Sequence, residues 1–423
     1  MGRTRKNAVK KQDALLDPQE VPEIPVEEQP YQLPKGWKWV RLLSSFSNHT
    51  DSKKKLPQKE YISTGTYPVI DQGKEVIGGY TENKDLLYSG PLPVVIFGDH
   101  TRCLKFIDFP FVQGADGVKV LYAKKTIIHK FLYYALRNIE MPHLGYRRHF
   151  PLFKNFMIPV PPLNIQENII VRIESLFAKL DEAKEQAEAV LDGFETRKVA
   201  ILHKAFSGEL TKIWRSEHGH KREEWQNLTL NDVAKWGSGG TPSRKQPEYY
   251  AGNIAWVKTG ELNNDYLYET EEHITKDAIK NSSAKIFPKE TVIIAMYGAT
   301  IGQCAILGID AATNQACACG IVRQNTYNKF LFNYLISEKN NFISLGKGGA
   351  QPNISQTIIK EYPISLPSLP EQREIVRILD VLLAKEQRIE EAAEYVLEQI
   401  ELMKKSILAR AFRGGLTTVC HYA

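Results

Sequence analysis

Two long segments of the chain carry apolar residues at the spacing of a coiled coil. The second segment, residues 370–417, alternates steps of four and three positions, the pattern of a helix that buries one narrow seam. The first segment, residues 163–212, keeps the same stripe less regularly, because Lys184 and Lys198 interrupt it. The positions expected in the two seams are Ile173, Phe177, Leu180, Leu191, Phe194, Leu379, Leu382, Ile389, Val396, Ile400 and Met403.

Proline and glycine delimit both segments. Each begins just after a proline cluster and closes on a glycine, Gly208 or Gly414, and Gly193 is the one glycine between these limits. At 1.5 Å per residue, about 37 residues make a rod of roughly 55 Å. A lone helix of this kind would expose its apolar stripe to water. We therefore expect the two helices to pack as an antiparallel pair, with a globular domain at each end.

Short β-type runs fill the rest of the chain. Residues 33–162 and 225–369 contain runs such as PVVIFG and TVIIAMYG, separated by turns rich in Gly, Pro and Asn. The predicted fold class is α+β: two strand-rich globular domains joined by two long antiparallel coiled-coil helices. Residues 1–32 are predicted to be an N-terminal tether of low intrinsic order, residues 213–224 a linker, and residues 418–423 a tail.

The chain is written twice. KAFSGELT at 204–211 returns as RAFRGGLT at 410–417, with five of eight letters identical, and KFL at 130–132 returns at 329–331. The separation is far longer than the repeat of a solenoid, which is roughly 20–50 residues. It indicates a duplicated module with a pseudo-twofold axis. The halves agree best in the helical segments and worst in the loops, which suits one scaffold that presents two different readers.

Composition excludes several classes of protein. No run of 18 apolar residues occurs, and the basic N-terminus lacks the apolar core of a signal peptide, so a cytoplasmic protein is expected. The five cysteines lack metal-site spacing, so no metal is expected. Phosphate-loop, dinucleotide, nucleophile-elbow and zinc-protease motifs are missing, and LGKGGAQPN from Leu345 resembles a phosphate loop only in composition. A non-catalytic binding protein is therefore favoured.

A net charge of +6 suits nucleic acid without demanding it. Basic and hydrogen-bonding side chains in the loops are the natural contacts to a DNA groove, although each such cluster could equally be a solvated surface. The Tyr-Arg-Arg-His run is the strongest candidate, because it places an aromatic ring inside a basic cluster. The candidate DNA-binding residues are Lys53, Lys54, Lys55, His100, Arg102, Tyr146, Arg147, Arg148, His149, Thr241, Ser243, Arg244, Lys245, Lys258 and Lys347.

Over nearly its whole length the chain resembles the specificity subunit of Type I restriction-modification enzymes. The motifs that carry the resemblance are LPKGWKWVRL at Leu33, GGTPSRKQPEYYAGNIAWVKTGEL from Gly239, YGATIGQCAIL from Tyr297, LPSLPEQREIVRIL before the second helix, and the two AF-x-G-x-LT endings. The first copy reads PLNIQENIIVRIE where the second has the LPEQ pattern, so its docking surface is expected to differ slightly.

The resemblance implies a division of labour. Each globular domain would read one half of an asymmetric bipartite DNA sequence, and the helices would fix the gap and dock two methyltransferase subunits. ATP-driven restriction subunits would join that core. S-adenosylmethionine, ATP and Mg²⁺ would belong to the partner subunits, with no cofactor in this chain. Two alternatives remain open: a bipartite system whose partner fuses methyltransferase and nuclease, and a two-headed protein scaffold.

Overall fold

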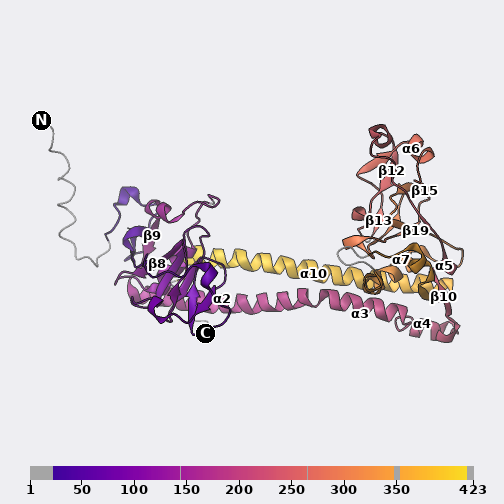
Figure 1. Ribbon diagram of the computed structural model, residues 1–423. Coiled ribbons are helices and arrows are strands. Elements are labelled where there is room, and N and C mark those ends of the chain that lie inside the picture. The colour runs from indigo at the N-terminus through magenta and orange to yellow at the C-terminus, as the bar shows by residue number, and fades with distance from the viewer. Residues whose placement is uncertain (1–21, 143, 264, 347–352, 417–423) are drawn as a thin grey trace. The chain divides into compact units, whose positions relative to one another are not determined.

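The computed structural model (Figure 1) describes residues 22–142, 144–263, 265–346 and 353–416. The chain divides into two compact units. Unit 1 is made of residues 1–187 and 395–423, and unit 2 of residues 188–394. Each unit therefore holds one strand-rich domain together with part of each long helical segment.

Unit 1 contains two sheets. The larger is antiparallel, in the order β2-β8-β5-β6, with β2 Phe46–Asn48, β8 Val118–Ala123, β5 Val94–Gly98 and β6 Leu104–Ile107. The smaller has the order β4-β3-β7, with β4 Gly79–Thr81, β3 Tyr67–Ile70 and β7 Val112–Gln113. Helix α1 (His129–Arg137) buries Phe131 and Leu132 in one core with Val95 and Phe97 of β5.

Unit 2 repeats this plan. Its larger sheet has the order β11-β19-β16-β17-β13, with β11 Ala234–Ser238, β19 Cys317–Val322, β16 Val292–Ala295, β17 Cys304–Leu307 and β13 Tyr266–Leu267. Its smaller sheet has the order β14-β12-β18-β15, with β14 Glu272–Ile274, β12 Ile254–Val257, β18 Ala311–Thr313 and β15 Ile286–Phe287. Helix α7 (Asn328–Ser337) occupies the place of α1. The duplication read from the sequence is thus confirmed strand by strand, and among the described residues the two sheets of unit 2 add β13 and β15.

A two-stranded ladder closes each domain. In unit 1, β1 (Lys38–Arg41) pairs antiparallel with β9 (Met157–Val160). In unit 2, β10 (Gln226–Thr229) pairs antiparallel with β20 (Pro363–Leu366). The ladder brings the start of each domain beside its end, so the long helix that follows leaves from a fixed point.

A buried glutamine ties that point to the domain in unit 1. The side-chain amide of Gln166 donates to the carbonyl oxygens of Thr126 (2.9 Å) and Pro161 (2.8 Å), and its oxygen accepts from the backbone N–H of Ile128 (2.9 Å). Gln166 is fully buried, so these bonds satisfy backbone groups that would otherwise lie unpaired near the helix start.

Unit 2 repeats the tie with Gln372. Its amide donates to Asn325 O and Pro367 O, both at 2.9 Å, and its oxygen accepts from Tyr327 N at 2.8 Å. Although PLNIQ and LPEQ differ in the sequence, the glutamine that they share makes the same three hydrogen bonds in both copies.

Three helices form the long segments. Helix α2 is Leu163–Asp192, α3 is Phe194–Phe206, and α10 is Leu369–Phe412. The expected first helix is therefore interrupted for one residue at Gly193, although backbone hydrogen bonds continue on both sides of it. No helix in the described part of the chain is long and apolar enough to cross a membrane.

The helices run antiparallel within each unit. In unit 1, Lys404 of α10 forms an ion pair with Asp181 of α2, while Leu408 shares a core with Phe177. In unit 2, Arg197 of α3 lies 2.7 Å from Glu386 of α10, while Leu202 shares a core with Leu379. In each unit the residue numbers therefore rise along one helix as they fall along the other, which makes the pair antiparallel. Glu386 stands four residues after Leu382 and three before Ile389, so it occupies a position of the predicted apolar repeat, and its pair with Arg197 explains why a carboxylate is tolerated there.

The seam differs in detail from the prediction. Ile173, Phe177, Phe194, Leu379 and Ile400 are buried, and Leu180, Leu191, Leu382 and Ile389 are half-buried. Val396 and Met403 are 40% and 50% exposed, so these two were placed wrongly. Here the inward positions are Ala393, Leu397, Ile400, Lys404 and Leu408. A strict seven-residue repeat drifts about 20° per heptad around a 3.6-residue helix, and the extra step of four after Lys404 keeps the stripe facing the domain core.

The repeated helix ending is a Schellman motif. Gly208 and Gly414 have φ of 83° and 84°, a conformation that favours glycine. The next residue's N–H bonds back to the carbonyl five positions earlier, Lys204 or Arg410. The alanine before each ending, Ala205 or Ala411, is fully buried in a domain core. The chain spells this ending twice because each helical segment must stop and dock on a domain.

Shorter elements complete the two units. The helices are α4 Lys212–Glu217, α5 Leu230–Val233, α6 Lys276–Lys280, α8 Lys339–Leu345 and α9 Gln356–Glu361. The 3-10 turns are η1 Val26–Glu28, η2 Leu42–Ser44, η3 Gln58–Glu60, η4 Lys84–Leu86, η5 Phe150–Asn155, η6 Arg222–Glu224, η7 Pro247–Tyr250, η8 Thr259–Glu261 and η9 Gly298–Thr300.

Candidate nucleic-acid interface

Three loops of unit 1 bring most of its candidate residues together. The loop after β2 approaches the β7–β8 turn, where Lys55 lies 3.6 Å from Asp116. The β5–β6 loop approaches the segment before η5, where the rings of His100 and Tyr146 stack at 4.7 Å and 11°. Gly117 of the β7–β8 turn joins the groups, because its carbonyl oxygen accepts from Asp99 N of the β5–β6 loop at 2.6 Å. Residues far apart in the sequence thus form one surface.

The Tyr-Arg-Arg run is the most exposed part of this surface. Tyr146 is 83% exposed, and Arg147 and Arg148 are exposed beside it. Neither arginine forms an ion pair with another residue that the structure describes. An unpaired guanidinium beside a flat ring can bind phosphate or the edge of a base.

His149 was placed wrongly among the DNA contacts. Its side chain is fully buried, and the N–H of Leu144 donates to Nε2 at 3.3 Å. Nε2 therefore accepts, and Nδ1 carries the proton that it donates to Asp99 O at 3.0 Å. His149 holds the exposed loop in place from behind. Sequence position alone could not separate it from its exposed neighbours.

Arg102 lies half-buried at the turn of the β5–β6 loop. Its φ is 64°, and Nη1 donates to Met141 O at 3.0 Å. The equivalent turn of unit 2 places Gly302 at a φ of 77°. Each residue donates its N–H back across the turn, Arg102 to Gly98 O and Gly302 to Ala295 O. The loop of unit 2 is therefore three residues longer, and the two domains differ in shape at this point.

Unit 2 builds its surface from equivalent loops. The loop after β11 carries Thr241, Ser243, Arg244 and Lys245, all exposed. Thr241 hydrogen-bonds Gln315 in the β18–β19 turn, as the loop after β2 meets the β7–β8 turn in unit 1. Lys347, the last candidate, lies outside the described residues.

Arg244 is held by the carboxylate of Glu272 and by the rings of Tyr250 and Trp256, which together we call the aromatic shelf. Its two terminal nitrogens lie 2.6 and 3.1 Å from the carboxylate oxygens of Glu272. Its guanidinium carbon lies 4.0 Å from the ring centroid of Tyr250 and 5.3 Å from that of Trp256. The hydrogen bond from Arg244 lowers the pKa of Glu272.

Lys258 meets the same acids. Its Nζ lies 2.8 Å from Glu271 and 3.0 Å from Glu272, and these bonds raise the pKa of Lys258. Arg244 and Lys258 are therefore partly neutralised, whereas Arg147 and Arg148 of unit 1 form no ion pair with a described residue. Sequence analysis missed Glu272 and the aromatic shelf, since nothing in their spacing links β14 to the loop after β11.

A buried network fixes the linker in unit 2. Glu371 accepts from Arg215 at 2.6 Å, from Thr211 at 2.7 Å and from the indole N–H of Trp225 at 3.0 Å. Ile165 stands at the equivalent position one residue before Gln166. The sequence difference between PLNIQ and LPEQ is therefore a polar joint in unit 2 and an apolar one in unit 1.

Three of the five cysteines lie in the core of unit 2. Cys304, Cys317 and Cys319 are buried in unit 2, and burial raises the pKa of each thiol. No group of three His, Cys, Asp or Glu side chains suitable for a metal occurs among the described residues.

The chain matches a known family in both halves. The family model described as "Type I restriction modification DNA specificity domain" matches residues 34–191 and 222–399. The EcoR124I/EcoR124II specificity subunit of a Type I restriction enzyme from Escherichia coli is 26% identical over 356 residues, covering 81% of this chain and 85% of the relative. The MjaIX specificity subunit from Methanocaldococcus jannaschii is 30% identical over 203 residues, 46% of each chain.

Solved structures show the same fold. A chain from a structure of the type I R-M system superposes with a TM-score of 0.68 at 18% identity, covering 91% of this chain and all of that chain. The HsdS subunit from Thermoanaerobacter tengcongensis gives a TM-score of 0.58 at 18% identity, covering 92% and 99%.

Proposed function

Because the chain belongs to the Type I restriction modification DNA specificity family, we propose that units 1 and 2 each read one half of a split DNA sequence. The chain is the specificity subunit of a Type I restriction-modification system, with two target-recognition domains. The observation that carries the proposal is the separate match of both copies to the DNA specificity domain. A two-headed protein scaffold is not favoured.

The loop surfaces are the readers in this proposal. Equivalent loops carry exposed polar side chains in both units, while their residues differ: Lys53 in the loop after β2, and Thr241 and Arg244 in the loop after β11. Different residues on one scaffold give an asymmetric target. The antiparallel helices would set the gap between the half-sites, as one turn of B-DNA, about 34–36 Å, separates half-sites in dimeric readers.

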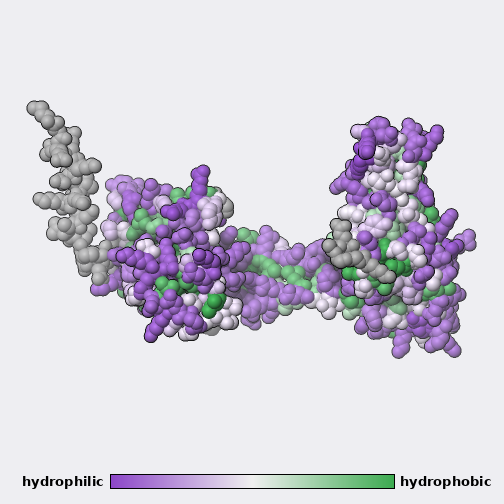
Figure 2. Space-filling view, in the orientation of Figure 1, coloured by the Kyte–Doolittle hydropathy of each residue, from purple (hydrophilic) through white to green (hydrophobic). Residues whose placement is uncertain are grey.

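Methyltransferase and restriction subunits are the expected partners. Apolar side chains remain exposed on the long helices, among them Val171 (64%), Val199 (55%), Val381 (59%) and Leu402 (50%), and Figure 2 shows green surface along these helices. Exposed apolar surface of this kind marks protein contacts. We expect two methyltransferase subunits to dock there, with restriction subunits joining that core.

Catalysis belongs to the partners in this account. The chain would bind DNA without changing it, and S-adenosylmethionine, ATP and Mg²⁺ would be held by the methyltransferase and restriction subunits. We expect the assembly to act in the cytoplasm, where its DNA substrate lies.

Binding of the purified chain to duplex DNA at several salt concentrations tests the proposal. Phosphate contacts predict that log K falls by about 0.9 per neutralised phosphate for each log unit of salt. A complex with the methyltransferase should in turn methylate adenines at one split sequence. A flat salt dependence, or methylation at unsplit sites, would contradict the proposal.

A further inference from the structure

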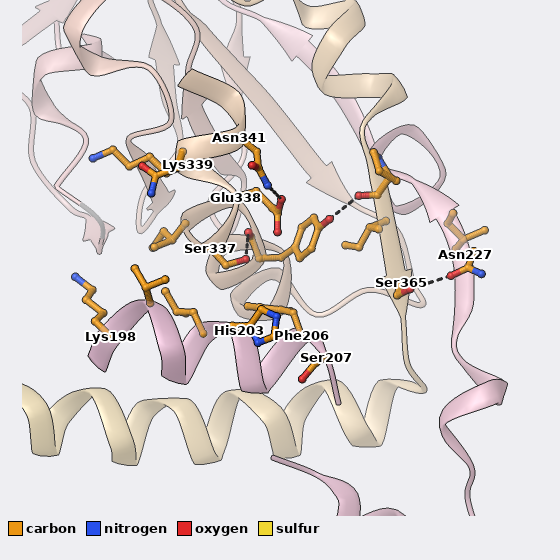
Figure 3. A pocket seen from close by; sticks show the side chains of 18 of the residues that line it. Lys198, His203, Phe206, Ser207, Asn227, Ser337, Glu338, Lys339, Asn341 and Ser365 are labelled. Atoms are coloured by element: carbon orange, nitrogen blue, oxygen red, sulfur yellow. Dashed lines mark hydrogen bonds between the residues drawn. The ribbon is translucent and has the colours of Figure 1, made fainter. Parts of the chain in front are cut away.

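Unit 2 contains an open groove of about 700 Å³. Helix α3 forms one wall, the α7–α8 junction the other, and strands β10 and β20 close one end (Figure 3). Figure 3 shows Lys198 and Lys339 toward one end, and Asn227 and Ser365 at the other. Phe206 lies between them. The lining is thus apolar in the middle, with two lysines at one end and the uncharged polar Asn227 and Ser365 at the other.

The duplication identifies the same place in unit 1. Asn227 pairs with Ser365 in the β10–β20 ladder, as Trp39 pairs with Pro159 in the β1–β9 ladder. The Schellman endings match Phe206 with Phe412, and the next residue, Ser207, with Arg413. Three residues that line the groove in unit 2, Asn227, Phe206 and Ser207, therefore have counterparts in unit 1.

In unit 1 a single side chain, Tyr31, covers all three counterparts. Its hydroxyl donates to Phe412 O at 3.3 Å, and its ring meets the Trp39 ring edge-to-face at 5.0 Å. The guanidinium of Arg413 lies 5.9 Å from the Tyr31 ring centroid. Trp39 is only 4% exposed as a result, whereas Asn227 is exposed.

The segment that carries Tyr31 is acidic and contains the 3-10 turn η1. Residues 22–31 read PEIPVEEQPY, and they lie before the duplicated part of the chain. Glu28 pairs with Arg41 at 2.5 Å and Glu23 approaches Lys38 at 3.8 Å. The backbone N–H of Ile24 donates to Trp39 O at 2.9 Å, and an isolated antiparallel bridge joins Glu23 to Val40 of β1.

We propose that the groove of unit 2 binds an acidic segment with an aromatic side chain, supplied by the methyltransferase subunit. Unit 1 fills the equivalent place with a segment of this chemistry from its own chain. Lys198 and Lys339 can pair with the acidic residues of the partner segment. Glu338, a carboxylate of the lining, is already held by Tyr362 (2.5 Å) and Asn341 (2.7 Å), so Glu195 is the remaining acid.

This inference rests on the proposed function, since it assumes a methyltransferase partner, and it makes the assembly asymmetric. One methyltransferase copy engages an open groove, and the other meets a unit whose equivalent place is filled from within. Removing the basic end of the groove should therefore weaken one copy and spare the other.

Cross-linking identifies the occupant. A photoreactive benzoylphenylalanine in place of Val199, which is 55% exposed on the rim, is incorporated into the full chain assembled with its methyltransferase subunit. Mass spectrometry should find cross-links to an acidic segment of the methyltransferase that contains an aromatic residue. Cross-links to residues 1–33 of this chain, or none to such a segment, would overturn the proposal.

Charge reversal measures the contribution of the groove. The double variant Lys198→Glu, Lys339→Glu should shift the assembly from two methyltransferase subunits to one at concentrations where the natural chain holds two, read by native mass spectrometry. The matched control, Lys276→Glu with Lys280→Glu on α6, should keep both. If the groove variant and the control variant both keep two methyltransferase subunits, the proposal that the groove binds a methyltransferase segment is refuted.

DNA binding separates the two failures. The ratio of affinities for specific and non-specific DNA, measured on the chain alone, should be the same in the groove variant and the natural chain. If that ratio is near one in the natural chain, the proposed function fails. If it is high while the groove variant keeps both methyltransferase subunits, only the groove proposal fails.

Discussion

Units 1 and 2 share a scaffold and differ where they would meet DNA. The ladders, the glutamine ties at Gln166 and Gln372, and the Schellman endings agree bond for bond. The loops do not: the β16–β17 loop of unit 2 is three residues longer than the β5–β6 loop of unit 1, and Arg147 and Arg148 of unit 1 are exposed whereas Arg244 of unit 2 pairs with Glu272. Contacts that position the readers are therefore kept in both copies, and contacts that would read sequence have diverged.

The joints between domain and helix differ as well. The largest effect is expected from Glu371→Ala, which leaves the buried Arg215 without its carboxylate. Breaking a buried ion pair costs about 3–5 kcal/mol. The free energy of unfolding from denaturant titration measures it. Ile165→Ala at the apolar joint of unit 1 should cost only about 1 kcal/mol, and equal costs at both joints would contradict this difference.

Ile400→Ala should cost about 2–5 kcal/mol, because its side chain is 3% exposed and its loss leaves a cavity. Met403→Ala, three residues on and 50% exposed, is the matched control and should be nearly neutral. Thermal and denaturant unfolding of both variants would sharpen the position of the seam. A larger loss of stability in the Met403→Ala variant than in the Ile400→Ala variant would contradict this seam and favour the strict heptad.

Arg147→Ala should weaken DNA binding and reduce the salt slope by about 0.9, the share of one phosphate contact. Arg244→Ala should change the slope less, because Glu272 already offsets the charge of Arg244. Fluorescence anisotropy on a duplex over a range of salt concentrations makes the comparison. A greater slope change at Arg244 would show that its pair with Glu272 opens on DNA.

The smallest effect concerns pH. The Arg244 hydrogen bond lowers the pKa of Glu272 below its ordinary 4.5. The stabilisation from this pair is therefore full above about pH 4.5 and is lost as the pH falls through the lowered pKa. NMR titration of the natural chain should give the Glu272 carboxylate a pKa below 4.5. The Arg244→Ala variant should return this pKa toward 4.5. An unshifted pKa of Glu272 in the natural chain would contradict the Arg244–Glu272 pair.

The sequence predicted the repeating features and missed the singular ones. Two helical segments, two strand-rich domains and the repeated ending follow from periodicity and from Gly and Pro positions, which act locally. His149 could not be separated from Arg148, because its burial depends on Asp99, fifty residues away. The Arg244–Glu272 pair depends on β14 lying beside the loop after β11. The predicted burial of Val396 and Met403 was wrong, because a strict heptad ignores the drift of the stripe around a 3.6-residue helix.

Exchange of residues 36–158 for the equivalent domain of another member of the family tests the central claim most directly. Methylated adenines are mapped genome-wide in cells carrying the natural or the exchanged chain with the same methyltransferase. The account predicts that one half of the recognised sequence changes while the other half and the gap stay the same. A change in both halves would contradict independent reading by the two units.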